Sequence, residues 1–300
     1  MTAASTSIRS LAALEANVNV KVKPAEMAAI DPLATKAEPR SANAPSRTTK
    51  LDTELARRIV APILGLLIFI LLWGAVAQVG QSLPGPVKTW QSAAEVFSDP
   101  FYRNGPNDQG IGWNVLASLK RVGIGFGLAA VVGIPLGFLI GRFRFLSDML
   151  APIISLLRPV SPLAWLPIGL LVFKAANPAA IWVIFISSVW PMIINTAVGV
   201  TRIPQDYLNV AKVWKVFTKI LFPSVLPYMM TGVRLSMGVA WLVIVAAEML
   251  TGGVGLGFWV WDEWNNLNVE HIIIAIFIVG IVGLLLEQLL LFVARRFNYE

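Results

Sequence analysis

The sequence contains no cysteine and a single histidine in 300 residues. Without cysteine, neither a disulfide bond nor a metal site built on thiolates can form. The lone His271 is accompanied by no cluster of histidines and carboxylates, which favours an interfacial residue over a catalyst or metal ligand. The hydrolase motif Gly-x-Ser-x-Gly and the phosphate loop Gly-x-x-x-x-Gly-Lys are also absent. These absences argue against an enzyme and predict no metal or cofactor in this chain.

Charged residues are scarce as well. They make up 14% of the sequence, whereas hydrophobic residues make up 56%. A water-soluble domain of this size could not accommodate so much apolar surface, so the composition predicts a protein that crosses the lipid bilayer several times. The formal net charge is +7. In such a protein this excess indicates positive cytoplasmic loops, and no nucleic-acid-binding motif supports the other interpretation.

Six apolar stretches are long enough to cross a hydrocarbon layer of about 30 Å. They are residues 59–79, 116–140, 149–173, 179–200, 229–250 and 272–293. The third contains four prolines, so it cannot be one straight helix. We therefore predict an all-α membrane protein with six transmembrane helices. Its expected parts are a disordered cytoplasmic tail (1–50), the first span with an extracytoplasmic connection (51–115) and a core transmembrane domain (116–297).

The distribution of lysine and arginine predicts the orientation of these spans. With the N-terminus inside, the outer segments carry only Lys88, Arg103 and Lys174. The inner segments carry Arg57, Arg58, Arg142, Arg144, Arg202, Lys212, Lys215, Lys219, Arg295 and Arg296. Because basic residues accumulate in cytoplasmic loops, both termini are expected in the cytoplasm.

Residues 203–227 are a basic, half-polar interruption between two apolar runs. Lysines recur there at three- and four-residue spacing, opposite aromatic and aliphatic side chains, which predicts an amphipathic helix ended by Pro223. The helix is either a surface connection between two spans or a docking element for a cytoplasmic partner. The residues expected to make the docking contact are Tyr207, Leu208, Ala211, Lys212, Trp214, Lys215 and Phe217.

Several charged residues fall at membrane depth, where a charge costs about 2.5–3.5 kcal/mol and tends to face the interior of the helix bundle. They are Lys120, Arg121, Arg158, Arg234, Glu248 and Glu287. A structural ion pair is one interpretation of each. The alternative is an anion path that Lys120, Arg121 and Arg158 make attractive, with Arg234 and Glu248 also along it. Arg158 is the favoured path residue, because neighbouring prolines free backbone groups that must face protein or a water-filled cavity.

The loop 251–270 contains no basic residue and combines glycines with aromatic and acidic side chains. It forms either an interfacial tryptophan belt or a gate and landing surface for an extracytoplasmic partner. The residues expected at such a gate are Trp259, Trp261, Asp262, Glu263 and Trp264.

Four segments, taken together, carry a family resemblance. They are SLKRVGIGFGLAAVVGIPLGFLIG, LRPVSPLAWLPIGLLVF, WPMIINTAVGV, and GVRLSMGVAWLVIVAAEML followed by GLG. The chain resembles the transmembrane permease subunits of bacterial ABC importers, in the branch that handles nitrate, nitrite, bicarbonate, sulfonates and taurine. The outer segments DPFYRNGPNDQGIGWN and VWDEWNN resemble the nitrate and bicarbonate members more than the sulfonate members.

The cytoplasmic coupling motif of that family is only partly matched. Asn209-Val210-Ala211 stands where the family has Glu-Ala-Ala, and Ile220-Leu221-Phe222-Pro223 stands where it has Ile-x-Leu-Pro. The glycine between them is missing, and the segment is several residues shorter between Val213 and Trp214. This departure weakens the prediction of a helix-turn-helix form for the coupling element.

The resemblance implies a non-catalytic permease subunit in the bacterial inner membrane. Its implied partners are a second permease copy, two cytoplasmic ATPase subunits that bind ATP and Mg²⁺, an extracytoplasmic solute-binding protein and membrane lipid. The implied substrate is a small inorganic anion, nitrate or nitrite first, with bicarbonate or a sulfonate such as taurine as the alternative. From another class, an ion-coupled secondary transporter would need internal repeats, and the sequence shows none.

The docking interpretation predicts the effect of removing an apolar anchor from residues 203–227. Trp214→Ala or Phe217→Ala is expected to uncouple ATP hydrolysis from uptake, because each side chain would seat in a groove of the ATPase. The spans should stay folded. Uptake and co-purification of the ATPase measure the effect, and wild-type values of both in both variants would contradict the docking role.

Overall fold

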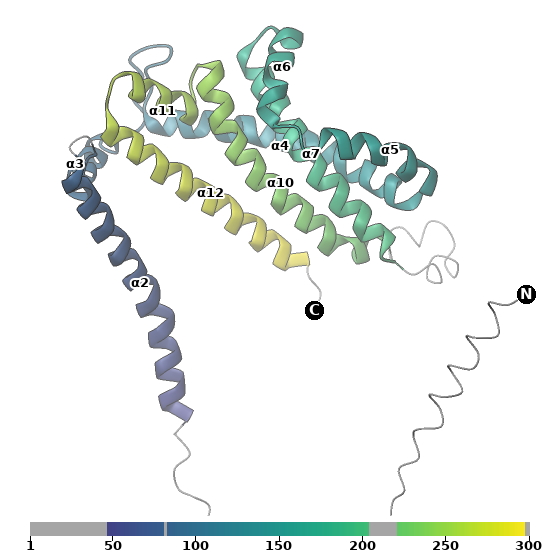
Figure 1. Ribbon diagram of the computed structural model, residues 1–300, viewed down its shortest axis with the longest axis horizontal. Coiled ribbons are helices and arrows are strands. Elements are labelled where there is room, and N and C mark those ends of the chain that lie inside the picture. The colour runs from purple at the N-terminus through teal and green to yellow at the C-terminus, as the bar shows by residue number, and fades with distance from the viewer. Residues whose placement is uncertain (1–46, 81–82, 204–220, 298–300) are drawn as a thin grey trace, which may run out of the picture. The chain divides into compact units, whose positions relative to one another are not determined.

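The computed structural model describes residues 47–80, 83–203 and 221–297. This part of the chain is almost entirely helical, with one isolated antiparallel bridge between Arg103 and Gln109. Its elements are α2 (Arg47–Val79), α3 (Pro86–Val96), α4 (Ile111–Arg142), α5 (Arg144–Leu157), η1 (Pro162–Trp165), α6 (Leu166–Phe173), α7 (Ala176–Thr201), α10 (Phe222–Thr251), α11 (Leu256–Asn265) and α12 (Val269–Phe297) (Figure 1). The chain divides into two compact units, 1–63 and 64–300, and the contacts below lie within the second.

Five of the described helices are long and apolar enough to cross a membrane. They contain the segments Arg57–Val79, Ile111–Arg142, Ala176–Thr201, Phe222–Thr251 and Val269–Arg296. Two further segments, Arg144–Leu157 and Pro162–Phe173, are bent against each other by 97° and make a sixth span if they are counted together. The prediction of an all-α membrane protein with a proline-broken third span is confirmed.

Helix α4 lies against α7 at a distance that only glycine permits. A Cβ atom added at Gly125, Gly137 or Gly141 would come within 2.7 Å of the Cβ of Ile184, Thr196 or Val200, respectively. Small residues of this kind let backbones approach in membranes, where lipid tails leave no hydrophobic force to press helices together. Gly133 lies in the same interface, where a Cβ atom would meet the Cβ of Met192 at 3.1 Å, whereas Gly127 faces open space.

Helix α10 packs on the other side of α7 through polar contacts as well as small residues. Ser236 Oγ donates a hydrogen bond to the Ser188 carbonyl at 2.6 Å. A Cβ atom at Gly232 would lie 2.8 Å from the Pro191 carbonyl oxygen. The helices α4, α7 and α10 therefore form the packed centre of the second unit (Figure 1).

Two short helices occupy segments that the sequence predicted as plain connections. Helix α3 begins at Pro86, where the missing N–H of proline costs nothing. Helix α11 buries Leu256 and Trp259 in a hydrophobic cluster that also contains residues of α10 and α12. Both were missed because each has barely three turns and no long apolar run.

The start of α10 also differs from the sequence prediction. The helix begins at Phe222, seven residues before the predicted span, and Pro223 lies in its first turn. Proline interrupts a helix interior but fits a first turn, so Pro223 is compatible with the start of α10. The predicted amphipathic helix before it lies outside the described residues, as do the docking residues Tyr207, Leu208, Ala211, Lys212, Trp214, Lys215 and Phe217.

The glycine contacts predict that Gly137→Ala destabilises the protein. The added methyl group meets the Cβ of Thr196 at 2.7 Å and the Ile193 carbonyl at 2.8 Å, so α4 and α7 must separate. Overpacking of this kind costs about 1–3 kcal/mol. Thermal unfolding of the detergent-solubilised protein measures it. Gly127→Ala is the matched control, because its Cβ meets nothing within 4 Å; equal melting temperatures for the two variants would contradict the packing argument.

Candidate functional site

The carboxylate of Glu248, near the end of α10, is almost completely buried, with 1% of the residue exposed. It accepts hydrogen bonds from Ser118 Oγ at 2.8 Å, from Arg121 Nη1 at 2.5 Å and from the Gly257 N–H at 3.0 Å. A buried carboxylate is stable only when it is paired and its oxygens are hydrogen-bonded, and both conditions hold here. The acid therefore joins α4, α10 and α11.

Neighbouring polar groups of α4 extend this arrangement to the start of α11. Ser118 Oγ accepts the Leu256 N–H at 2.9 Å, and Asn114 Oδ1 accepts the Gly255 N–H at 2.8 Å. Three successive N–H groups at the start of α11, which a helix leaves without internal partners, are thus satisfied by side chains. We call Asn114, Ser118, Arg121 and Glu248 the α11 clasp.

Glycines make the close approach of α11 possible. A Cβ atom at Gly255 would lie 2.4 Å from Glu248 Cδ, and one at Gly257 would lie 1.9 Å from the Val245 carbonyl oxygen. Gly252 and Gly253, in the turn before α11, have φ values of 76° and 88°, which glycine adopts without strain. The run GGVGLG is therefore a structural requirement of the clasp.

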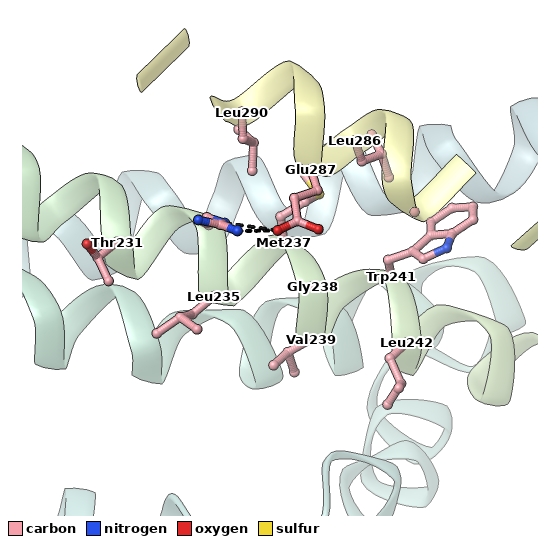
Figure 2. A pocket seen from close by; sticks show the side chains of 12 residues that line it. Thr231, Leu235, Met237, Gly238, Val239, Trp241, Leu242, Leu286, Glu287 and Leu290 are labelled. Atoms are coloured by element: carbon pink, nitrogen blue, oxygen red, sulfur yellow. Dashed lines mark hydrogen bonds and ion pairs between the residues drawn. The ribbon is translucent and has the colours of Figure 1, made fainter. Parts of the chain in front are cut away.

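A second ion pair lies nearer the start of α10, where Arg234 faces Glu287 of α12. Its side chains are 51% and 49% exposed, unlike the enclosed pair of Arg121 and Glu248. The pair borders a cavity of about 690 Å³ that residues of both helices line. Figure 2 shows Glu287 among these lining side chains. The apolar lining includes Leu235, Met237, Val239, Trp241, Leu242, Leu286 and Leu290.

The structure brings only some of the predicted path residues together. Arg121 and Glu248 form one ion pair, and Arg121 Nε also donates to Asn177 Oδ1 at 2.7 Å. Arg234 lies fourteen residues from Glu248 on α10, about 21 Å at 1.5 Å per residue. Lys120 is exposed on α4, and Arg158 is exposed at the bend that follows α5. Their role in a path stays a prediction.

The predicted outer gate residues have different environments. Trp259 is buried and stacks on His271, with ring centroids 5.7 Å apart. Glu263 Oε1 lies 3.0 Å from His271 Nδ1. Trp261, Asp262 and Trp264 are exposed on α11. These three side chains are accessible to a partner, whereas Trp259 packs in the hydrophobic cluster that holds α11 against α10 and α12.

The connection before α4 contains a cation–π contact. The Arg103 guanidinium lies 3.8 Å from the ring centroid of Trp113, and Trp113 Nε1 donates to the Phe101 carbonyl at 2.9 Å. Burial, with the nearby Asp108 as a second cause, raises the pKa of the Tyr102 hydroxyl above its ordinary value. The phenol therefore stays neutral in this connection.

Sequence reasoning missed Asn114, Ser118, Gly255 and Gly257. A signal for part of this set was available, because Ser118 and Arg121 are three residues apart and share a helix face. Nothing local in the sequence connects that face with Glu248, which is more than 120 residues away.

Comparisons with known proteins show the family. Residues 133–299 match the family of binding-protein-dependent transport system inner membrane components. The nitrate import permease protein NrtB of Synechocystis sp. is 46% identical over 241 residues, which cover 78% of this chain and 88% of that protein. The bicarbonate transport system permease protein CmpB of the same organism is 48% identical over 239 residues, covering 77% and 85%.

A solved structure of the methionine ABC transporter MetNI, in an inward-facing conformation, shares the fold. Its TM-score is 0.54 at 16% identity, and the match covers 62% of this chain and 95% of that one. The present chain belongs to the family of binding-protein-dependent transport system inner membrane components. This membership confirms the family resemblance noted in the sequence. It also confirms that the chain is a transport component of the membrane and not an enzyme. Membership implies ATPase and binding-protein partners.

The clasp predicts a large difference between the two ion pairs in their contribution to stability. Glu248→Ala leaves the Arg121 guanidinium, whose side chain is 11% exposed, without its partner, which typically costs about 3–5 kcal/mol. The yield and melting temperature of the solubilised protein should fall. The control Glu287→Ala removes the partner of the Arg234 guanidinium, whose side chain is already half exposed. This variant should therefore lose much less stability. Equal losses would contradict the distinction.

Proposed function

We propose that this chain is the permease subunit of an ATP-driven importer for a small inorganic anion, nitrate or nitrite in the first place. The observation that carries the proposal is the similarity to nitrate and bicarbonate permeases, at 44–48% identity over about three quarters of the chain. Bicarbonate is the alternative substrate, and sulfonates such as taurine come next. Nitrate and bicarbonate are both planar and singly charged, so one path suits either.

The proposed complex contains two copies of this chain, two cytoplasmic ATPase subunits that bind ATP and Mg²⁺, and an extracytoplasmic solute-binding protein. The exposed Arg234 and Glu287 at membrane depth support a second copy, because a facing permease would keep lipid, an unfavourable neighbour for charges, away from the pair and its cavity. The exposed face of α11, with Trp261, Asp262 and Trp264, is the proposed contact for the binding protein. Both termini are placed in the cytoplasm, on the basis of the lysine and arginine distribution.

Arg158 is the proposed attractive charge along the path. It follows α5 at the 97° bend, it is exposed, and no acidic partner pairs with it among the described residues. A cation without a paired carboxylate attracts anions more strongly than one that is neutralised locally. Lys120, exposed on α4 directly beside Arg121 of the clasp, would add to the same potential.

Uptake into proteoliposomes tests this function. The full complex with its binding protein should accumulate labelled nitrate or nitrite only when ATP is present, with bicarbonate and taurine as parallel arms. Accumulation of bicarbonate alone would transfer the assignment to the alternative substrate. Uptake by the isolated chain without ATPase would overturn the proposal.

The same assay includes one variant of the path. Arg158→Ala should lower the rate of uptake while the amount of assembled complex stays the same, because an exposed side chain without an acidic partner contributes little to folding. Loss of the folded complex instead would show that Arg158 is a structural residue.

A further inference from the structure

Helix α10 carries two ion pairs with opposite properties. The pair of Glu248 and Arg121 is enclosed, and its carboxylate also accepts hydrogen bonds from Ser118 and Gly257. The pair of Arg234 and Glu287 has about half of each side chain exposed and borders a cavity. A structural role explains the enclosed pair completely. The open pair leaves hydrogen-bonding capacity that the described residues do not use.

The unused capacity is on the guanidinium of Arg234. Both its Nε, at 3.1 Å, and its Nη2 donate to the same oxygen of Glu287, Oε1. No acceptor among the described residues takes a hydrogen bond from Nη1. Guanidinium is planar and binds two oxygens of a carboxylate or similar anion side by side. One edge of Arg234, formed by Nη1 and Nη2, therefore remains able to receive such an anion.

The position of Arg234 on α10 places this edge at membrane depth. Arg234 is near the middle of α10, which extends from residue 222 to 251 and is long enough to span the bilayer. An arginine at that depth avoids hydrocarbon and faces protein or water. The cavity beside it, about 690 Å³, is much larger than a four-atom oxyanion with a few waters. Figure 2 shows Glu287 projecting from α12 between Leu286 and Leu290, and its Oε1 accepts a hydrogen bond from Arg234 Nε.

We propose that Arg234 is a binding site for the transported anion inside the membrane, with Glu287 as its built-in competitor. This inference rests on the proposed function and assigns a site for the substrate class. A trigonal oxyanion such as nitrate or bicarbonate hydrogen-bonds to the Nη1 and Nη2 edge. When the anion leaves, the guanidinium keeps its hydrogen bonds from Nε and Nη2 to Glu287 Oε1.

The competitor explains how binding can be strong enough for entry and weak enough for release. An uncompensated arginine in a low-dielectric cavity would hold an anion tightly and slow transport. Conduction requires a site that the ion both enters and leaves readily. The neighbouring carboxylate of Glu287 lowers the affinity because it repels the anion and shares the Nη2 donor. Arg234 and Glu287 together therefore form a weak, reversible site.

Binding and uptake by the full complex test this site. Broadening of the ¹⁵N line of labelled nitrate (or the ¹³C line of bicarbonate) measures weak binding to the permease–ATPase complex without the binding protein. Arg234→Gln should weaken binding about tenfold or more, the loss expected for charge-assisted hydrogen bonds. Glu287→Gln should tighten binding and slow turnover. Unchanged nitrate and bicarbonate binding in Arg234→Gln, or no binding by the wild type, would overturn the proposal.

The double variant Arg234→Gln with Glu287→Gln separates a binding role from a structural one. If the pair only stabilises the fold, removing both charges leaves no uncompensated ion, and uptake should recover relative to the single variants. That recovery would overturn the proposal. If Arg234 binds the anion, the double variant assembles but stays deficient in binding and uptake. Wild-type uptake is measured in the same experiment, so a complex that moves neither anion refutes the proposed function separately.

A pair of glycine variants adds a test that leaves both charges in place. Gly238 lines the cavity one helical turn after Arg234, and a Cβ atom there meets nothing within 4 Å. Gly238→Leu should fill part of the cavity and lower uptake without loss of the assembled complex. Gly280→Leu is the matched control, because Gly280 on α12 is equally open but lies outside the cavity lining. Equal uptake by both variants would contradict a path through this cavity.

Discussion

The burial of one carboxylate, that of Glu248, determines how α4, α10 and α11 are held together. A charge in a low-dielectric interior has to be paired and hydrogen-bonded, and the donors come from two other helices. Ser118 and Arg121 come from α4, and the Gly257 N–H comes from α11. Gly255 and Gly257 leave room for this acid, because a Cβ atom would lie 2.4 Å from Glu248 Cδ at the first position and 2.8 Å from Glu248 Cβ at the second.

The other charged pair on α10 follows the same electrostatic rule with a different outcome. Arg234 and Glu287 neutralise each other but remain half accessible, so the constraint is met without closing the site. Along one helix, the protein thus combines an enclosed pair that fixes neighbouring elements and an open pair beside a cavity. This division fits a transport component, which needs a rigid frame as well as a place where ions can be exchanged.

Much of the fold could be predicted from the sequence because lipid imposes strong rules. Apolar length gave the spans, and the prolines between Arg144 and Phe173 gave the broken one. Short helices such as α3 and α11 escaped prediction, because their stability comes from tertiary contacts of residues such as Trp259. The spacing of Ser118 and Arg121 indicated a shared face. Their partner Glu248 could not be inferred, since it depends on how distant helices pack.

The α11 clasp has a mechanical consequence. The hydrogen bonds of Asn114, Ser118 and Glu248 to Gly255, Leu256 and Gly257 leave α11 no hinge of its own against α4 and α10. A push on the exposed tryptophans of α11 that keeps these bonds intact must tilt the end of α10 as well. Because α10 is continuous to Phe222, it would act as a lever that carries a displacement at one surface of the membrane toward the other.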